Sequence, residues 1–137
     1  MDENAVEWIY DDGKAVALLI RAEYRPEKST FPTPSDLPQQ LGFIVYRAGE
    51  RIRAHSHVPI ERRLVGTAEM ILVRSGRAFV DLYNAKRELL ATREMRKDDL
   101  LYVFDCGHGF RMSEDTVLLE IKQGPYTGVS EKECFGQ

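Results

Sequence analysis

Two of the three histidines in the chain, His55 and His57, are separated by a single residue. On a β-strand, residues two apart point to the same face, so the two imidazole rings would lie close enough to bind one metal ion. The third, His108, stands between two glycines, which permit close approach of the backbone. Glu69 lies between these positions and could add a carboxylate. These residue types predict a metal centre.

Three neutral imidazoles and one carboxylate suit one divalent ion of Fe, Mn, Ni, Co or Zn. Four such ligands on an octahedral ion leave two positions for substrate or water. The ligand set does not select among these metals. The alternative is that the histidines are surface or hydrogen-bonded residues that bind nothing.

Arginines accompany the histidine pair in the sequence. Arg53 would share the strand face of His55, and Arg62 and Arg63 follow shortly after. Because a guanidinium group binds a carboxylate or phosphate at two points, we expect an anionic small-molecule substrate bound first by Arg53 and second by Arg62 or Arg63. The alternative is a solvated basic edge that pairs with Glu50 and Glu61.

Candidates for proton transfer lie near the end of the chain. Glu120 and Lys122 alternate with Leu119 and Ile121, which predicts a strand with one polar face. If that face points into the site, Lys122 is the expected proton carrier; the alternative is that it faces solvent. Tyr102 is a second catalytic candidate, although a lone Tyr in an apolar strand is usually part of the core.

The elements that must position these residues are predicted to be strands. Short apolar stretches rich in Val, Ile, Leu, Phe and Tyr recur between turn signals, which is typical of a β-sandwich or barrel. Asp-Gly at 12–13 predicts a hairpin turn, whereas four prolines between Pro26 and Pro38 predict a surface crossing. The expected strands are 6–10, 15–21, 41–47, 52–57, 69–73, 78–83, 88–95, 100–104, 109–112 and 117–122.

One segment is ambiguous. Residues 86–97 are strong helix formers, so a helix is the alternative to a hairpin with its turn at 84–87. The surrounding strand pattern favours the hairpin, because tertiary context often overrides propensity. Residues 98–99, Asp-Asp, are expected to form a turn, since Asp tolerates left-handed angles.

Composition limits the classes of function. The 137 residues suffice for one domain, and 43% hydrophobic with 30% charged residues is the balance of a folded chain. A net charge of −3 argues against nucleic acid as a partner. The acidic start, the absence of a long apolar run and the two cysteines, Cys106 and Cys134, lead us to expect a cytoplasmic protein without a membrane partner. Cys106 could reach the metal, although a packed thiol is the expected alternative.

The spacing around the histidines resembles the first motif of the cupin family: Gly, five residues, His-x-His, a short spacer, Glu, six residues, Gly. Gly49 through His57 matches its first half, and Glu69 through Gly76 matches its second half. The spacer departs from the pattern, with eleven residues between His57 and Glu69 where three or four are usual. Glu61 follows His57 after three intervening residues, but Ala68 stands where its closing Gly belongs, so Glu61 is the fallback.

The second motif is matched more loosely. Asp98-Asp99 replaces the usual Gly-Asp, and Phe104 to Gly107 replaces the Pro-x-Gly, while His108-Gly109-Phe110 fits. The resemblance covers about residues 39–132 and extends to small single-domain bacterial cupins of unassigned function.

The resemblance implies an all-β, cupin-type jelly-roll barrel with the metal held by His55, His57, Glu69 and His108. We expect residues 1–40 to form a hairpin and a Pro-rich crossing within the same domain, 41–126 the barrel and 127–137 a tail. By analogy, the expected function is metal-assisted isomerisation, epimerisation or elimination of a sugar or nucleotide-sugar substrate. The alternatives are an Fe(II)-dependent oxygenase and a non-catalytic binding or sensing module. We also expect a homodimer, with the N-terminal hairpin covering an open sheet edge.

Overall fold

The computed structural model describes residues 4–128 and 130–136. These residues contain eight strands and no helix, which confirms the predicted all-β class. None of the described residues belongs to a helix with the length and apolarity to cross a membrane. The strands are β1 (Val6–Asp11), β2 (Lys14–Ile20), β3 (Glu69–Ser75), β4 (Arg77–Tyr83), β5 (Leu89–Arg96), β6 (Leu100–Val103), β7 (Gly107–Met112) and β8 (Val117–Lys122).

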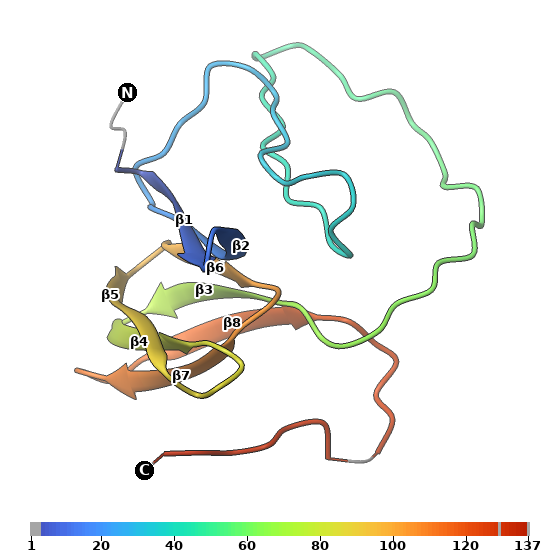
Figure 1. Cartoon of the computed structure of the whole chain (residues 1–137). Coiled ribbons are helices and arrows are strands. Elements are labelled where there is room, and N and C mark those ends of the chain that lie inside the picture. Colours follow the sequence, from blue (N-terminus) through green and yellow to red (C-terminus); the bar gives the residue numbers. More distant parts are fainter. Residues whose placement is uncertain (1–3, 129, 137) are drawn as a thin grey trace. The chain divides into compact units, whose positions relative to one another are not determined.

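The chain divides into two compact units, one formed by residues 1–24 and 67–137 and the other by residues 25–66. The first unit contains all eight strands, in two antiparallel sheets with the orders β1-β2-β6-β3-β8 and β5-β4-β7 (Figure 1). The N-terminal hairpin is therefore part of the five-stranded sheet, where β2 pairs with β6.

Turn chemistry explains the two hairpins that the sequence predicted. Asp12 and Gly13 both have positive φ, 48° and 79°, as the tight turn between β1 and β2 requires. Between β4 and β5, Asn84 accepts hydrogen bonds from the backbone of Lys86 and Glu88 at 2.9 Å. The helix considered for residues 86–97 is wrong, because the segment gains backbone partners along β4 and buries Met95 completely.

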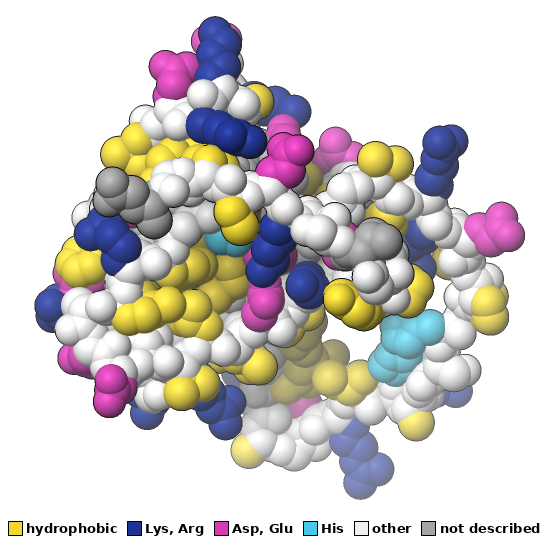
Figure 2. Space-filling view, turned by 90° about the horizontal axis from the view of Figure 1, so that it is seen from below, with side chains coloured by type: hydrophobic (Ala, Val, Ile, Leu, Met, Phe, Trp, Pro, Cys, Tyr) yellow, Lys and Arg dark blue, Asp and Glu magenta, His cyan; other side chains and the backbone are white. Residues whose placement is uncertain are grey.

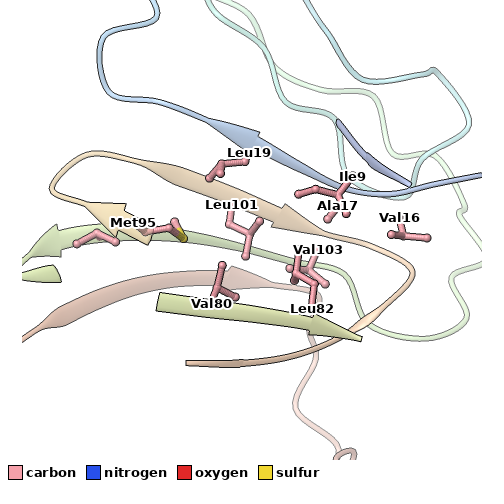
Figure 3. Packing of buried hydrophobic residues seen from close by; sticks show 10 residues of the cluster. Ile9, Val16, Ala17, Leu19, Val80, Leu82, Met95, Leu101 and Val103 are labelled. Atoms are coloured by element: carbon pink, nitrogen blue, oxygen red, sulfur yellow. The ribbon is translucent and has the colours of Figure 1, made fainter. Parts of the chain in front are cut away.

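The core lies between the inward faces of the two sheets. On β3 the side chains of Glu69, Ile71 and Val73 are buried, while Met70 and Leu72 are half-buried, as expected for alternating faces. Figure 3 shows the apolar cluster to which both sheets contribute. Each fully buried Leu, Val or Met side chain stabilises the fold by about 1.5–3 kcal/mol. The cluster comprises Ile9, Val16, Ala17, Leu19, Val73, Val80, Leu82, Met95, Leu101 and Val103.

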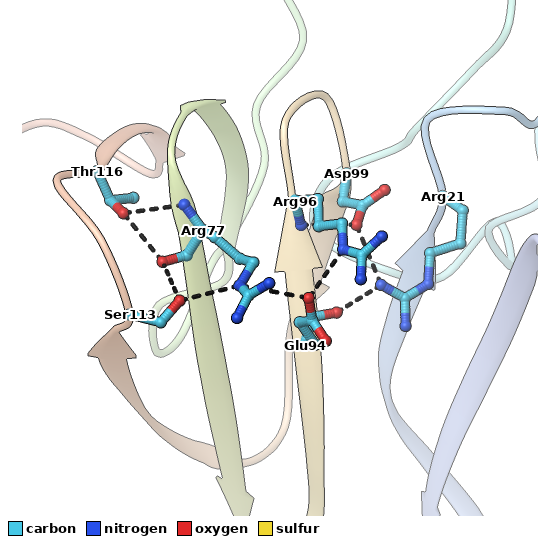
Figure 4. Close-up of polar contacts among 7 residues, drawn as sticks. All are labelled: Arg21, Arg77, Glu94, Arg96, Asp99, Ser113 and Thr116. Atoms are coloured by element: carbon cyan, nitrogen blue, oxygen red, sulfur yellow. Dashed lines mark hydrogen bonds and ion pairs between the residues drawn. The ribbon is translucent and has the colours of Figure 1, made fainter.

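The predicted turn at Asp98 and Asp99 is confirmed, and Asp99 has a structural role. Asp98 has a φ of 70°, and the buried Asp99 carboxylate accepts backbone hydrogen bonds from Ala22 and Arg96, both at 2.9 Å. It also pairs with Arg21 at 3.0 Å (Figure 4). This carboxylate therefore ties the β5–β6 turn to the end of β2.

The second unit, residues 25–66, has no strand (Figure 1). Its one bridge joins Thr30 to Phe43, and the Pro-rich part is irregular backbone, as predicted. The strands expected at 41–47 and 52–57 are wrong for this structure, since the isolated bridge of Phe43 does not extend into a ladder and most of these side chains are exposed. Figure 2 shows hydrophobic side chains at the surface; those exposed in this unit include Ile44, Ile52, Val58, Ile60 and Val65.

Candidate functional site

Two of the predicted metal ligands meet between the sheets of the first unit. Glu69 is the first residue of β3 in the five-stranded sheet, and His108 lies on β7 in the three-stranded sheet. The His108 Nε2 atom lies 3.0 Å from Oε2 of Glu69. The Glu69 side chain is 9% exposed and that of His108 is 27% exposed, so the contact is sheltered but reachable.

Glu69 lies beside two charged groups of β8. The ladder pairs Glu69 with Lys122 and Ile71 with Glu120, which places Lys122 and Glu120 on the sheet face that Glu69 shares. Burial raises the pKa of the Glu69 carboxyl, and a hydrogen bond with Glu120 raises it further, against the opposing effects of His108 and Lys122. Glu120 and Lys122 are both exposed and neither lines the cleft beside Glu69, which agrees with the solvent-facing alternative. The role of Lys122 in proton transfer stays a prediction.

A cleft of about 530 Å³ lies over the Glu69–His108 contact. Its walls come from β3, β4, β6 and β7 and from residues 131–136 near the C-terminus. Cys106 also lines the cleft while packing against the core, and burial raises the pKa of its thiol to about 12. Such a thiol is protonated at neutral pH, in agreement with the packed role expected for it.

His55 and His57 belong to the second unit and are exposed. Their rings lie 5.2 Å apart between centroids, and Nδ1 of His55 lies 2.9 Å from the carbonyl oxygen of Arg53. The rings are thus neighbours, although the strand that was to align them is absent. No cluster of three or more His, Cys, Asp or Glu side chains suited to a metal ion occurs within residues 4–128 and 130–136.

The predicted substrate-binding arginines are exposed residues of the second unit. Arg53, Arg62 and Arg63 all lie in irregular backbone, as does Glu61, the fallback ligand. Their roles stay predictions. Glu69 differs from Glu61 in being buried and in contact with a second predicted ligand, His108.

Tyr102 is fully buried. The ladder pairs it with Met70 and Leu18, whereas Glu69 pairs with Val103, so Tyr102 points to the opposite face of the sheet from Glu69. This position does not support the catalytic role predicted for Tyr102. Its burial agrees with the packing role named as the alternative, although Tyr102 packs on the other face of the sheet from the cluster between the sheets, with its ring 5.1 Å from that of Phe104.

Sequence reasoning missed the residues that close the cleft from the C-terminal side. Phe135 lies against Tyr83 at 5.0 Å between ring centroids, in an edge-to-face arrangement. The only sequence signal was one aromatic residue in an otherwise polar tail, and nothing in that signal identifies its partner.

Comparisons with models of known protein families, with curated proteins and with solved structures found no match.

Proposed function

We propose that this protein is a metal-binding cupin with a jelly-roll fold. In this proposal it is an enzyme that isomerises, epimerises or eliminates from a small anionic substrate of the sugar or nucleotide-sugar type. The observation that carries the proposal is the contact between Glu69 and His108, which brings together two residues assigned as ligands from separate motifs. The two lie on different sheets, so only the tertiary fold could have joined them.

The two side chains are of types that bind divalent metals. A carboxylate and an imidazole are donors that Fe(II), Mn(II), Ni(II), Co(II) and Zn(II) accept. The distance of 3.0 Å between His108 Nε2 and Glu69 Oε2 is that of an ordinary hydrogen bond, and it brings both donors to one point. The donor types and their proximity therefore support this half of the site.

The other half is His55 with His57, and the proposal requires these rings to join Glu69 and His108.

In this proposal the metal ion and the side chains have separate roles in the reaction. A divalent ion would supply Lewis-acid polarisation of a substrate carbonyl or hydroxyl. Lys122 lies on the face of Glu69 and would carry a proton to or from the substrate, with Glu120 beside it. Arg53, with Arg62 or Arg63 as the second residue, would bind the anionic group of the substrate.

Metal analysis is the experiment that tests this function. Protein purified without oxygen should contain about one divalent ion per chain, and a panel of sugar phosphates should reveal turnover. Stoichiometric iron with substrate-dependent oxygen uptake would replace the proposal with the oxygenase alternative. Ligand-induced stabilisation with no turnover across the panel would indicate a binding module instead.

We also propose that the protein is a cytoplasmic homodimer. Both β1 and β8 are terminal strands of the five-stranded sheet, and terminal strands are commonly covered by association. Light scattering after size exclusion measures the mass of the assembly, and fractionation of cells measures its location. A mass equal to one chain at micromolar concentration would contradict the dimer.

A further inference from the structure

The C-terminal residues 130–136, here called the strap, run along one side of the cleft that contains Glu69 and His108. Residues 131–136 all line this cleft. The strap has no strand or helix of its own, so side-chain contacts hold it in place. It belongs to the same compact unit as the two sheets.

Phe135 is the main anchor of the strap. Its ring meets Tyr83 edge-to-face at 5.0 Å, and the guanidinium carbon of Arg87 lies 4.9 Å from the centre of the same ring. Arg87 also pairs with Glu133, with 3.5 Å between Nη2 and Oε2. One arginine at the β4–β5 turn thus holds an acidic and an aromatic residue of the strap.

The lack of a side chain at Gly107 on β7 leaves room for the Phe135 ring. A Cβ atom at Gly107 would come within 3.1 Å of Phe135, closer than most side-chain contacts allow, so the ring would have to shift by a few tenths of an ångström. Gly107 directly precedes His108, one of the two site residues. Gly107, against which Phe135 packs, and the candidate site residue His108 are therefore neighbours on β7.

We infer that the strap is a reversible cover that controls access to the Glu69–His108 cleft, with Phe135 as its latch. A segment without backbone pairing opens at a lower free-energy cost than a strand. Here one aromatic pair, one cation–π contact and one exposed ion pair oppose that opening. A ligand entering the cleft would displace Phe135, and a bound ligand could be retained when Phe135 returns. The inference rests on the cleft alone and does not require the proposed metal.

Access can be measured through Cys106, which lines the cleft. In a Cys134→Ser background it is the single cysteine of the chain. A small uncharged methanethiosulfonate reagent, followed by intact mass in the presence of a chelator, gives the modification rate. Phe135→Ala should raise this rate about tenfold, the effect of losing one aromatic pair and one cation–π contact. Trypsin cleavage after Lys132 in the strap should accelerate in parallel.

Two further variants make the test specific. Tyr126→Ala removes an aromatic residue that is 81% exposed, so it should leave both rates unchanged. Glu133→Lys places a like charge beside Arg87, so it should raise the modification rate of Cys106 roughly twofold to threefold, and added salt should reduce that rise. Trypsin is not used on this variant, because the substitution adds a cleavage site. Equal rates in Phe135→Ala and Tyr126→Ala would overturn the inference. So would a faster rate accompanied by a lower midpoint of cooperative thermal unfolding, because Phe135 would then hold the fold rather than the cover.

Discussion

Glu69 and His108 join the two sheets through a side-chain contact of 3.0 Å between a carboxylate oxygen and an imidazole nitrogen. The carboxylate is buried and also interacts with Glu120, which makes its charged form costly in the absence of a cation. His108 and Lys122 offset part of that cost, because each favours the charged carboxylate. A divalent ion bound there would favour it further, as the proposed function requires.

The substitution Glu69→Gln tests whether Glu69 is a metal ligand. The amide keeps the size of the side chain but removes the charge that a metal ligand supplies, so affinity for Mn(II) or Ni(II) should fall at least about 100-fold. Isothermal titration calorimetry with each metal measures the loss. Glu61→Gln is the matched control and should bind as the unaltered protein does. The reverse result, with Glu61→Gln impaired and Glu69→Gln unaffected, would assign the ligand to the fallback position.

The substitution Arg53→Ala tests whether Arg53 binds the anionic group of the substrate. If Arg53 grips a carboxylate or phosphate, the affinity for glucose 1-phosphate, used as a probe, should fall about tenfold, since a charge-assisted hydrogen bond is lost. Arg74→Ala removes another exposed arginine, on β3, and should change nothing. Titration monitored by intrinsic fluorescence or calorimetry gives both affinities. Unchanged binding in Arg53→Ala would leave this residue as part of a solvated basic edge.

The hydrogen-bonded ion pair between Glu7 and Arg93 predicts that the free energy of unfolding depends on pH. The guanidinium lies 2.7 Å from Glu7 through Nη2 and 2.8 Å through Nε, and it holds the pKa of the Glu7 carboxyl below its usual value of 4.5. The folded state therefore binds this proton less readily than the unfolded state. The stabilisation is complete above pH 4.5 and is lost as pH falls through the lowered pKa.

Glu7→Gln should reduce the free energy of unfolding at pH 7 by about 0.5–1 kcal/mol. This value is modest because about a third of each side chain meets solvent, which screens the pair. The difference from the unaltered protein should shrink as pH falls below 4.5. Urea unfolding at pH 7, 5 and 3 measures it, with the exposed Glu27→Gln as control. A constant difference at all three values would show that the charge on Glu7 is not the cause.

Most strands of the first unit were predictable, because their sequences carry an apolar pattern and a recognisable turn. The sequence at 12–13 gives the β1–β2 turn, and alternation on β3 separates buried Glu69 and Ile71 from the half-buried Met70. Residues 89–96 were ambiguous, because propensity favours a helix and only pairing with β4 decides for a strand. The local sequence pattern predicts a strand correctly where the fold also provides a neighbouring strand for it to pair with.

The candidate site was half predictable for the same reason. His55 and His57 would share a face only if residues 52–57 form a strand, and a strand requires a neighbour that local pattern cannot name. Glu69 and His108 lie on strands that have neighbours, and they meet. Phe135 could not have been assigned from sequence, since its partners Tyr83 and Arg87 are distant in the chain.

Gly76 provides a last prediction, on the turn that joins the two sheets. Its φ is 89°, and a Cβ atom there would overlap the carbonyl oxygen of Asp115 and approach Thr116. Gly76→Ala should therefore cost both left-handed strain and a backbone clash, together about 2–4 kcal/mol. Gly13→Ala has a similar φ of 79° with no atom within 4 Å of the new Cβ, so it should cost only about 1 kcal/mol. Thermal unfolding should separate the two variants by roughly 5–10 °C. If both lose the same stability, the clash with Asp115 relaxes at no cost and the tight junction between β3 and β4 does not require glycine.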